Sequence, residues 1–102
     1  MADLLEHYDA QLNALCKKHQ VRTLEVFGSA ASGTWDATTS DLDFLVDFLP
    51  LSPGQGADAY FGLLFDLEDL FHRKIDLVEA RAVKNAYFLA SINQNRKVLY
   101  AA

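Results

Sequence analysis

Apolar and polar side chains alternate almost perfectly over residues 41–48, DLDFLVDF. A period of two places successive side chains on opposite faces of a β-strand. One face carries Leu42, Phe44, Val46 and Phe48. The other face carries Asp41, Asp43, Leu45 and Asp47. The pattern therefore predicts a strand that is buried on one face and carries carboxylates on the other.

The remaining periodicities divide the chain into alternating helices and strands. Apolar residues that recur every three or four positions predict amphipathic helices, and short apolar runs between turn-forming residues predict strands. The expected helices cover residues 3–19, 59–72 and 81–95. The expected strands cover residues 21–27, 41–48, 74–78 and 97–100. This order predicts an α/β (α+β) two-layer fold, with helices packed on a small mixed sheet of about four strands.

The same patterns predict structural roles for individual residues. Cys16 lies in the apolar stripe of the first helix, so we expect it in the core. Asp58 is placed to cap the helix that follows it, and His72 stands where that helix ends. Glu25 is most simply a surface residue of the first strand.

Two features allow alternative interpretations. The helix expected over 81–95 has apolar residues on two sides, which indicates either burial beneath the first helix or a patch for a partner protein. Trp35 either stacks on a nucleotide base or lies on the protein's own surface.

Composition narrows the class of protein. A chain of 102 residues that is 51% hydrophobic predicts one globular domain over 1–102. The net charge of −5 disfavours direct nucleic-acid binding, which needs a basic face, but it is compatible with a nucleotide ligand. The acidic first residues do not resemble a signal peptide, and no uncharged run reaches the ~18 residues of a membrane span. We therefore expect a cytoplasmic protein without membrane association.

The carboxylates of the second strand indicate a metal site. Asp41 and Asp43 are two residues apart, so on a strand they share a face at a backbone separation of roughly 6–7 Å. Like charges held that close repel each other unless a cation lies between them. Mg²⁺ suits such a pair, because it binds one or two carboxylates and completes its shell with water and phosphates.

The end of the first strand offers groups that bind phosphate. Gly28 allows a close backbone approach, and Ser29 adds a hydroxyl and an N–H group. A turn that opens here into a short helix would direct backbone N–H groups at an anion. Ser40 is placed to form a local hydrogen bond that fixes Asp41. Together these features predict a phosphoryl or nucleotidyl transfer site, against the alternative of an ordinary turn followed by an edge strand with solvated aspartates.

The third strand supplies a further carboxylate. Asp76 stands in the middle of the short apolar run KIDLV, where an aspartate is costly to bury unless it is paired or binds metal. The alternative is an exposed residue of an edge strand, and Glu79 is a substitute candidate for the same role.

These motifs resemble a known family. Gly28-Ser29, eleven intervening residues and Asp41-Leu42-Asp43 are similar to the signature of the DNA polymerase β-like nucleotidyltransferases. The short chain resembles the minimal nucleotidyltransferases (MNT proteins), the antitoxin-side partners of HEPN toxins. Two details differ from that family. The gap is usually about ten residues, which a loop absorbs at small cost. The residue after the serine is often basic, whereas Ala30 is uncharged.

The resemblance implies a complete mechanism. It implies that Asp41 and Asp43 hold one or two Mg²⁺ ions, and that Asp76 is the third carboxylate, acting as a metal ligand or as a base. Gly28 and Ser29 would hold the β- and γ-phosphates of a nucleoside triphosphate. The family reaction would move AMP from ATP to a tyrosine hydroxyl of a HEPN toxin and so silence it, the chain acting as antitoxin.

Two other functions remain open at the level of the sequence. The first is a binding module that neutralises a toxin by covering it, with a weak or inactive site. The second is a free-standing transferase that acts on a small hydroxyl compound.

Overall fold

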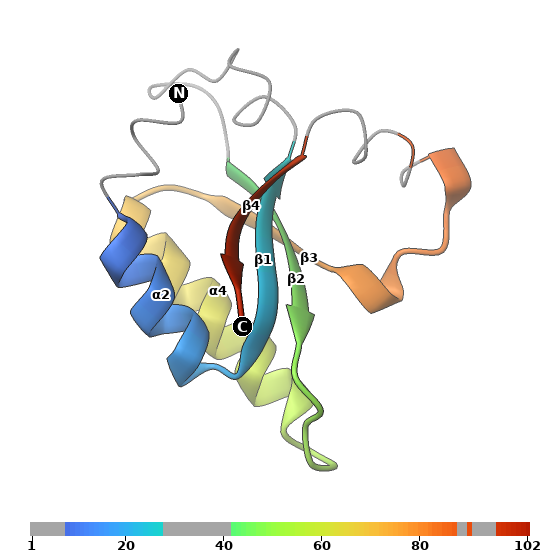
Figure 1. The fold of residues 1–102 in the computed structure, drawn as a ribbon, viewed down its shortest axis with the longest axis horizontal. Helices are drawn as coiled ribbons and strands as arrows, with labels where there is room; N and C mark the ends of the chain where they lie inside the picture. The colour runs from blue at the N-terminus through green and yellow to red at the C-terminus, as the bar shows by residue number, and fades with distance from the viewer. Residues whose placement is uncertain (1–7, 28–41, 88–89, 91–95) are drawn as a thin grey trace.

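The fold was taken from a computed structural model, which describes residues 8–27, 42–87, 90 and 96–102. Its helices are α2 (Asp9–Lys18), α4 (Gly56–Phe71) and the 3₁₀ helix η1 (Ala80–Ala82). Its strands are β1 (Val21–Phe27), β2 (Leu42–Phe48), β3 (Ile75–Glu79) and β4 (Arg96–Ala101). Figure 1 shows the strands side by side, with α2 and α4 beside them.

The strands form one four-stranded mixed sheet, as predicted, and their order is β3-β2-β1-β4. β1 pairs in antiparallel fashion with both β2 and β4, whereas β2 and β3 run parallel. Parallel neighbours need a long crossover connection, and α4 lies in the segment that joins β2 to β3.

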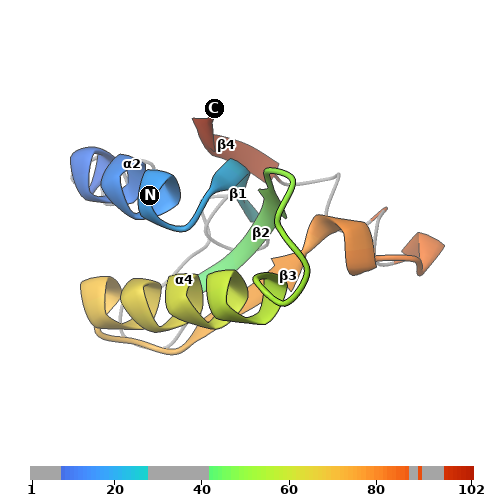
Figure 2. The same ribbon diagram turned by 90° about the horizontal axis from the view of Figure 1, so that it is seen from below.

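Both long helices cover the same face of the sheet, so the fold has two layers (Figure 2). The four alternating apolar residues of β2 are at most 5% exposed, which confirms the predicted inward face. Phe44 at the centre of this core stacks on Phe71 of α4, with ring centroids 5.9 Å apart. Cys16 is also fully buried as expected, and burial raises the pKa of its thiol to about 12.

The strand boundaries agree with the predicted ones to within one residue wherever the structure describes them. Within residues 8–19, the described part of the first predicted helix, the structure is helical over Asp9–Lys18. His72 ends α4 as expected: it adopts a left-handed backbone, and its N–H donates to the carbonyl of Glu68 at 2.8 Å. Neither long helix in the described ranges has the length and apolarity that crossing a bilayer requires.

The predicted helix over 81–95 is wrong at its start. Residues 80–82 form only a 3₁₀ turn, residues 83–85 are not helical, and described helical residues resume at 86. Ala80 and Val83 pack instead against Phe27 and Leu45, on the sheet face opposite α2. Ala80 and Val83 are therefore not buried beneath the first helix. Their packing on the opposite face of the sheet outweighs the helical periodicity of the sequence.

The predicted cap of the second helix is also wrong. The helix begins at Gly56, earlier than expected, and the residue before it is Gln55, which forms no side-chain capping bond. A turn in which Ser52 and Gln55 exchange hydrogen bonds of 3.0 Å precedes the helix and allows this earlier start. Asp58 consequently lies within the first turn, where its charge favours the helix dipole.

A histidine–aspartate pair joins the two long helices. His19, which follows α2, donates through Nε2 to Oδ2 of Asp66 on α4 at 2.6 Å, and Lys18 lies 3.2 Å from the same oxygen. The imidazole rests against Gly62, where an added Cβ would lie 2.7 Å from Cε1 of His19. The absence of a side chain at Gly62 therefore allows the two helices to approach.

We expect Gly62→Ala to destabilise the fold by about 1–3 kcal/mol, because the new methyl must displace a ring that Asp66 holds in place. Urea unfolding measures the change. Gly56→Ala is the matched control, since a Cβ there meets nothing within 4 Å, and it should be neutral or slightly stabilising. Equal stability of the two variants would contradict the close contact at Gly62.

The same pair predicts an acid-dependent contribution to stability. The hydrogen bond from His19, with a smaller effect of Lys18, holds the pKa of Asp66 below its usual range. A lowered folded-state pKa stabilises the fold above the unfolded value of about 4, and this stabilisation is lost as the pH falls through the folded-state pKa. Unfolding measured from about pH 5.5 to about pH 3 should therefore show that the stability advantage of the wild type over Asp66→Asn shrinks as the pH falls.

Asp69→Asn serves as the control for that titration. Asp69 is exposed on the same helix and has no ion pair with a described residue. The difference in stability between Asp69→Asn and the wild type should not shrink in the same way as the pH falls. A constant difference for Asp66→Asn across the titration would show that the pair with His19 contributes nothing to acid sensitivity.

Candidate active site

Two of the three predicted carboxylates lie directly beside each other. In the parallel pairing of β2 with β3, Asp43 is opposite Asp76. Neighbouring strands are about 4.8 Å apart, so side chains that leave them on the same face can reach a common ligand. Both aspartates do leave on the same face, because the residues on either side of each are buried toward the helices: Leu42, Phe44, Ile75 and Leu77.

The two carboxylates differ in their environment. Asp43 is half-buried, whereas Asp76 is exposed on β3, which is at one edge of the described sheet. Asp76 is therefore an exposed residue of an edge strand and also lies opposite Asp43, and its role as the third carboxylate stays a prediction. Glu79 is a poorer candidate, because it lies opposite Val46, three residues further along β3.

Tyr60 of α4 lies against the same strand. Its hydroxyl donates to the backbone carbonyl of Leu77 at 2.5 Å. Burial raises the pKa of Tyr60, and the negative charges of Asp76 and Glu79 raise it further. The hydroxyl of Tyr60 therefore joins α4 to β3, and the nearby negative charges of Asp76 and Glu79 favour its protonated form.

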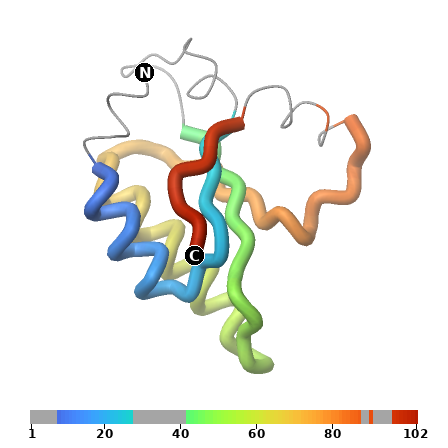
Figure 3. Tube along the Cα trace, viewed as in Figure 1, coloured from blue at the N-terminus to red at the C-terminus, as the bar shows by residue number. Residues whose placement is uncertain are grey.

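The residues predicted to bind phosphate, together with Asp41, are adjacent in the sequence to the strand residues at this end of the sheet. Phe27, the last residue of β1, is opposite Asp43, and Figure 3 shows that β1 ends where β2 begins. Gly28 and Ser29 follow Phe27, and Ser40 and Asp41 precede Leu42. These four residues lie outside the described part of the chain, so their predicted roles stay predictions.

The end of β3 and the segment after it cover part of the same sheet face, from Phe27 to Asp47. Val78, Ala80 and Val83 pack against the buried side chains of Phe27 and Leu45. Arg81 forms an ion pair with Asp47, with Nε 2.9 Å from Oδ1 but without hydrogen-bond geometry, and its Nη2 lies 3.5 Å from the carbonyl of Phe48. The covered region reaches Phe27, the residue opposite Asp43 on β1.

Glu25 was wrongly expected at the surface. It lies on the face of Asp43 and is only 8% exposed, because Arg96 of β4 pairs with it. Nε of Arg96 donates to Oε1 of Glu25 at 3.1 Å, and Nη2 donates to Oε2. The sequence contains one signal for this pair: a charged residue within the apolar run of β1 and an arginine at the start of the last strand.

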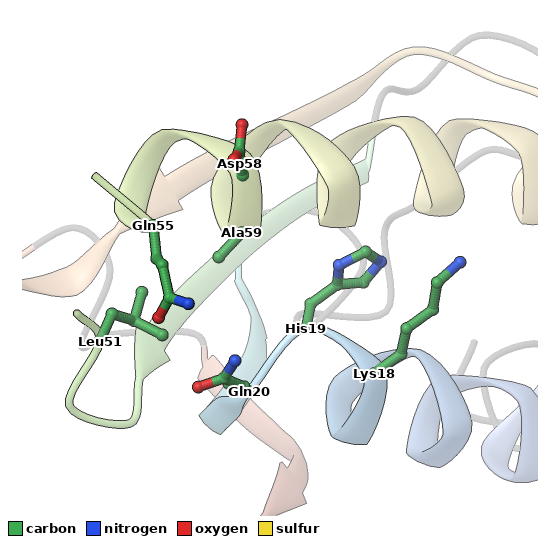
Figure 4. A pocket seen from close by; sticks show the side chains of 7 residues that line it. All are labelled: Lys18, His19, Gln20, Leu51, Gln55, Asp58 and Ala59. Atoms are coloured by element: carbon green, nitrogen blue, oxygen red, sulfur yellow. The ribbon is translucent and has the colours of Figure 1, made fainter. Parts of the chain in front are cut away.

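The surface hollow drawn in Figure 4 is elsewhere. It has a volume of about 210 Å³ and lies between the end of α2 and the start of α4, where β1 begins and β2 ends. None of its lining residues is a predicted site residue: Lys18, His19, Gln20, Leu51, Gln55, Asp58 and Ala59. In the described ranges no three His, Cys, Asp or Glu residues gather as a metal site. Of the predicted metal ligands, the described residues include two, Asp43 and Asp76.

Comparison with known proteins identifies the family that this chain matches. The family described as "nucleotidyltransferase domain" matches residues 9–99. A protein of Methanocaldococcus jannaschii, provisionally named a protein adenylyltransferase, is 35% identical over 81 residues, which are 79% of each chain.

Solved structures share the fold. A protein described provisionally as a minimal nucleotidyltransferase superimposes with a TM-score of 0.72 and 27% identity, over 93% of this chain and 92% of the other. A chain of the complex between a tri-AMPylated Shewanella oneidensis HEPN toxin and its MNT antitoxin gives a TM-score of 0.65 at 17% identity, over 96% and 73%. At that identity the second match concerns the fold alone.

Proposed function

The chain belongs to the nucleotidyltransferase domain family and is a nucleotidyltransferase; on that premise we propose that it moves AMP from Mg²⁺-ATP to a tyrosine hydroxyl of a partner HEPN toxin. The transfer would silence the toxin, so that the chain acts as its antitoxin. The single observation that carries the proposal is the register that places Asp43 beside Asp76.

The donor set suits a hard divalent ion. Asp43 and Asp76 offer carboxylate oxygens from adjacent strands, and Asp41 precedes Asp43 at the spacing that keeps one strand face. We assign these three residues as the metal ligands. Bound Mg²⁺ would neutralise the charge that develops on the triphosphate during transfer.

The remaining residues take roles in binding and proton transfer. Gly28 and Ser29 are proposed to hold the β- and γ-phosphates through backbone N–H groups and the hydroxyl, and Ser40 to fix Asp41. The acceptor oxygen bonds to the α-phosphorus as the bond to the β-phosphate oxygen breaks, and pyrophosphate leaves. Asp76 is exposed, so an incoming hydroxyl can approach it and give up its proton there.

Two relatives support the choice of acceptor. The M. jannaschii protein is named for transfer of AMP to protein, and the Shewanella complex contains an AMPylated HEPN toxin beside an MNT antitoxin. Both statements concern those proteins, and they motivate the same reaction as a proposal for this chain.

We expect Mg²⁺-dependent ATP binding in calorimetry, weakened about tenfold or more in Asp43→Asn and in Asp76→Asn, because each loses a charged metal ligand. Glu79→Gln is the matched control on β3 and should bind like the wild type. Wild-type affinity in Asp76→Asn together with loss in Glu79→Gln would move the third carboxylate to Glu79.

The transfer itself is tested on the partner. Incubation of a cognate HEPN toxin with the chain, ATP and Mg²⁺ should add AMP to a toxin tyrosine, detected by intact-protein and peptide mass spectrometry. The double variant Asp41→Asn/Asp43→Asn should add none and should no longer neutralise the toxin. If that variant neutralises the toxin at equal dose, complex formation is sufficient and the proposed role of the transfer fails.

A further inference from the structure

We propose that α4 and the end of β3 form a docking surface for the acceptor protein, which inserts a lysine or arginine side chain beside Glu79 and packs apolar side chains on Phe61 and Phe65. The inference rests on the proposed function, because it concerns the protein that brings the tyrosine to the site. It gives a role to two exposed phenylalanines and a carboxylate that the reaction does not use.

The two phenylalanines of α4 face away from the protein's own core. Phe61 is 50% exposed and Phe65 is 62% exposed, and their rings stack with centroids 6.3 Å apart. Leu63 and Leu67, which alternate with them along the helix, are fully buried, so the pair lies on the side of α4 that is turned from the sheet. Single exposed apolar side chains are common, whereas adjoining large ones indicate a surface that a partner covers.

A hollow adjoins this pair at the start of α4. It has a volume of about 380 Å³, and Figure 2 shows that the start of α4 lies close to β3. Six residues line it: Gly56, Ala57, Tyr60, Phe61, Glu79 and Ala82. The rings of Tyr60 and Phe61 meet edge to face, with centroids 5.2 Å apart. The hollow therefore combines two aromatic rings of α4 with one carboxylate of β3.

The side chains of the hollow suit a cation. Glu79 is the charged residue among the six, it is half-buried, and it has no ion pair with a residue in the described ranges. A carboxylate that is partly withdrawn from water favours an opposite charge beside it. Aromatic rings attract the same kind of group through their faces. A lysine or arginine side chain would find both partners here.

The position of the hollow favours the acceptor protein as the occupant. β3 is at one edge of the described sheet, and Asp76 on this strand is exposed. Glu79 is three residues further along the same strand, so about 10 Å separate the two backbones. A protein whose tyrosine hydroxyl reaches Asp76 therefore lies across this edge, next to the start of α4.

Charge distinguishes this occupant from a second copy of the chain. Each copy has a net charge of −5, so two copies repel each other. Acidic residues also stand three or four positions from the phenylalanines on α4: Asp58, Glu68 and Asp69. An apolar centre with an acidic rim is complementary to a basic surface on another protein.

The test measures the affinity of the chain for a purified cognate HEPN toxin without nucleotide. Phe61→Ala/Phe65→Ala should weaken toxin binding about tenfold or more, because aromatic side chains at the centre of an interface contribute most of its affinity. Phe65→Ala alone keeps the contact between Tyr60 and Phe61 and should also weaken binding. ATP affinity should equal that of the wild type in both variants.

Tyr87→Ala is the matched control for the phenylalanines. Tyr87 is 90% exposed, and residues 83–87 lie apart from α4 in Figures 1 and 2. This variant should bind the toxin like the wild type.

Glu79→Gln tests for the cation. It should weaken toxin binding at low salt and reduce the salt dependence of the affinity, because one ion pair is lost. Asp9→Asn removes the same charge from the exposed start of α2 and should leave both quantities unchanged.

The docking surface and the transfer reaction fail in different ways. If Phe61→Ala/Phe65→Ala binds the toxin like Tyr87→Ala while the wild type transfers AMP, only the docking surface is wrong. If the double variant loses toxin binding but the wild type transfers no AMP, the docking surface stands and the proposed function fails. No toxin binding by the wild type would overturn both.

Sedimentation of the chain alone tests the other occupant. A wild-type dimer that Phe61→Ala/Phe65→Ala abolishes, with toxin binding unchanged, would show that a second copy covers this surface and would overturn the inference. A monomer in both cases supports the acceptor protein as the occupant.

Discussion

The candidate site depends on the parallel pairing of β2 with β3. Because parallel neighbours cannot be joined by a tight turn, the chain must cross over between them, and α4 lies on that path. The helix is held on the sheet by Leu63, Leu67 and Phe71, which are buried in the main core. With α4 in place, β3 takes the register that sets Asp76 beside Asp43. Hydrophobic packing on one face of the sheet therefore determines which charges meet on the other.

On the sheet face that the helices leave open, the kind of side chain changes along the strands. Asp43 and Asp76 lie at one end, the small apolar cluster begins beside them at Phe27 and continues to Leu45, and the ion pair of Asp47 with Arg81 lies at the other end. The candidate site residues that the structure describes, Asp43 and Asp76, thus lie on strands rather than on loops. Strands fix side-chain positions more closely than loops do, which suits a reaction that requires several charges at defined separations.

Much of this arrangement could be predicted from the sequence, because period-two alternation in β2 and helical periodicity in α4 report burial directly. The pairing partners could not, since the register of Asp43 with Asp76 and the ion pair of Glu25 with Arg96 arise only when separate strands meet. The helix expected from residue 81 failed for a related reason: Val83 gains more from the cluster with Phe27 and Leu45 than from a helical turn. The proposals for Gly28, Ser29, Ser40 and Asp41 rest on the motif and on chain connectivity alone.

The most direct test of the central claim is a crystal structure of the chain grown with Mn²⁺ and a non-hydrolysable ATP analogue, with anomalous scattering used to locate the metal. The account predicts metal density in contact with carboxylate oxygens of both Asp43 and Asp76, with the triphosphate on the same face of the sheet. Metal bound away from that pair, or the two carboxylates on opposite faces of the sheet, would contradict it.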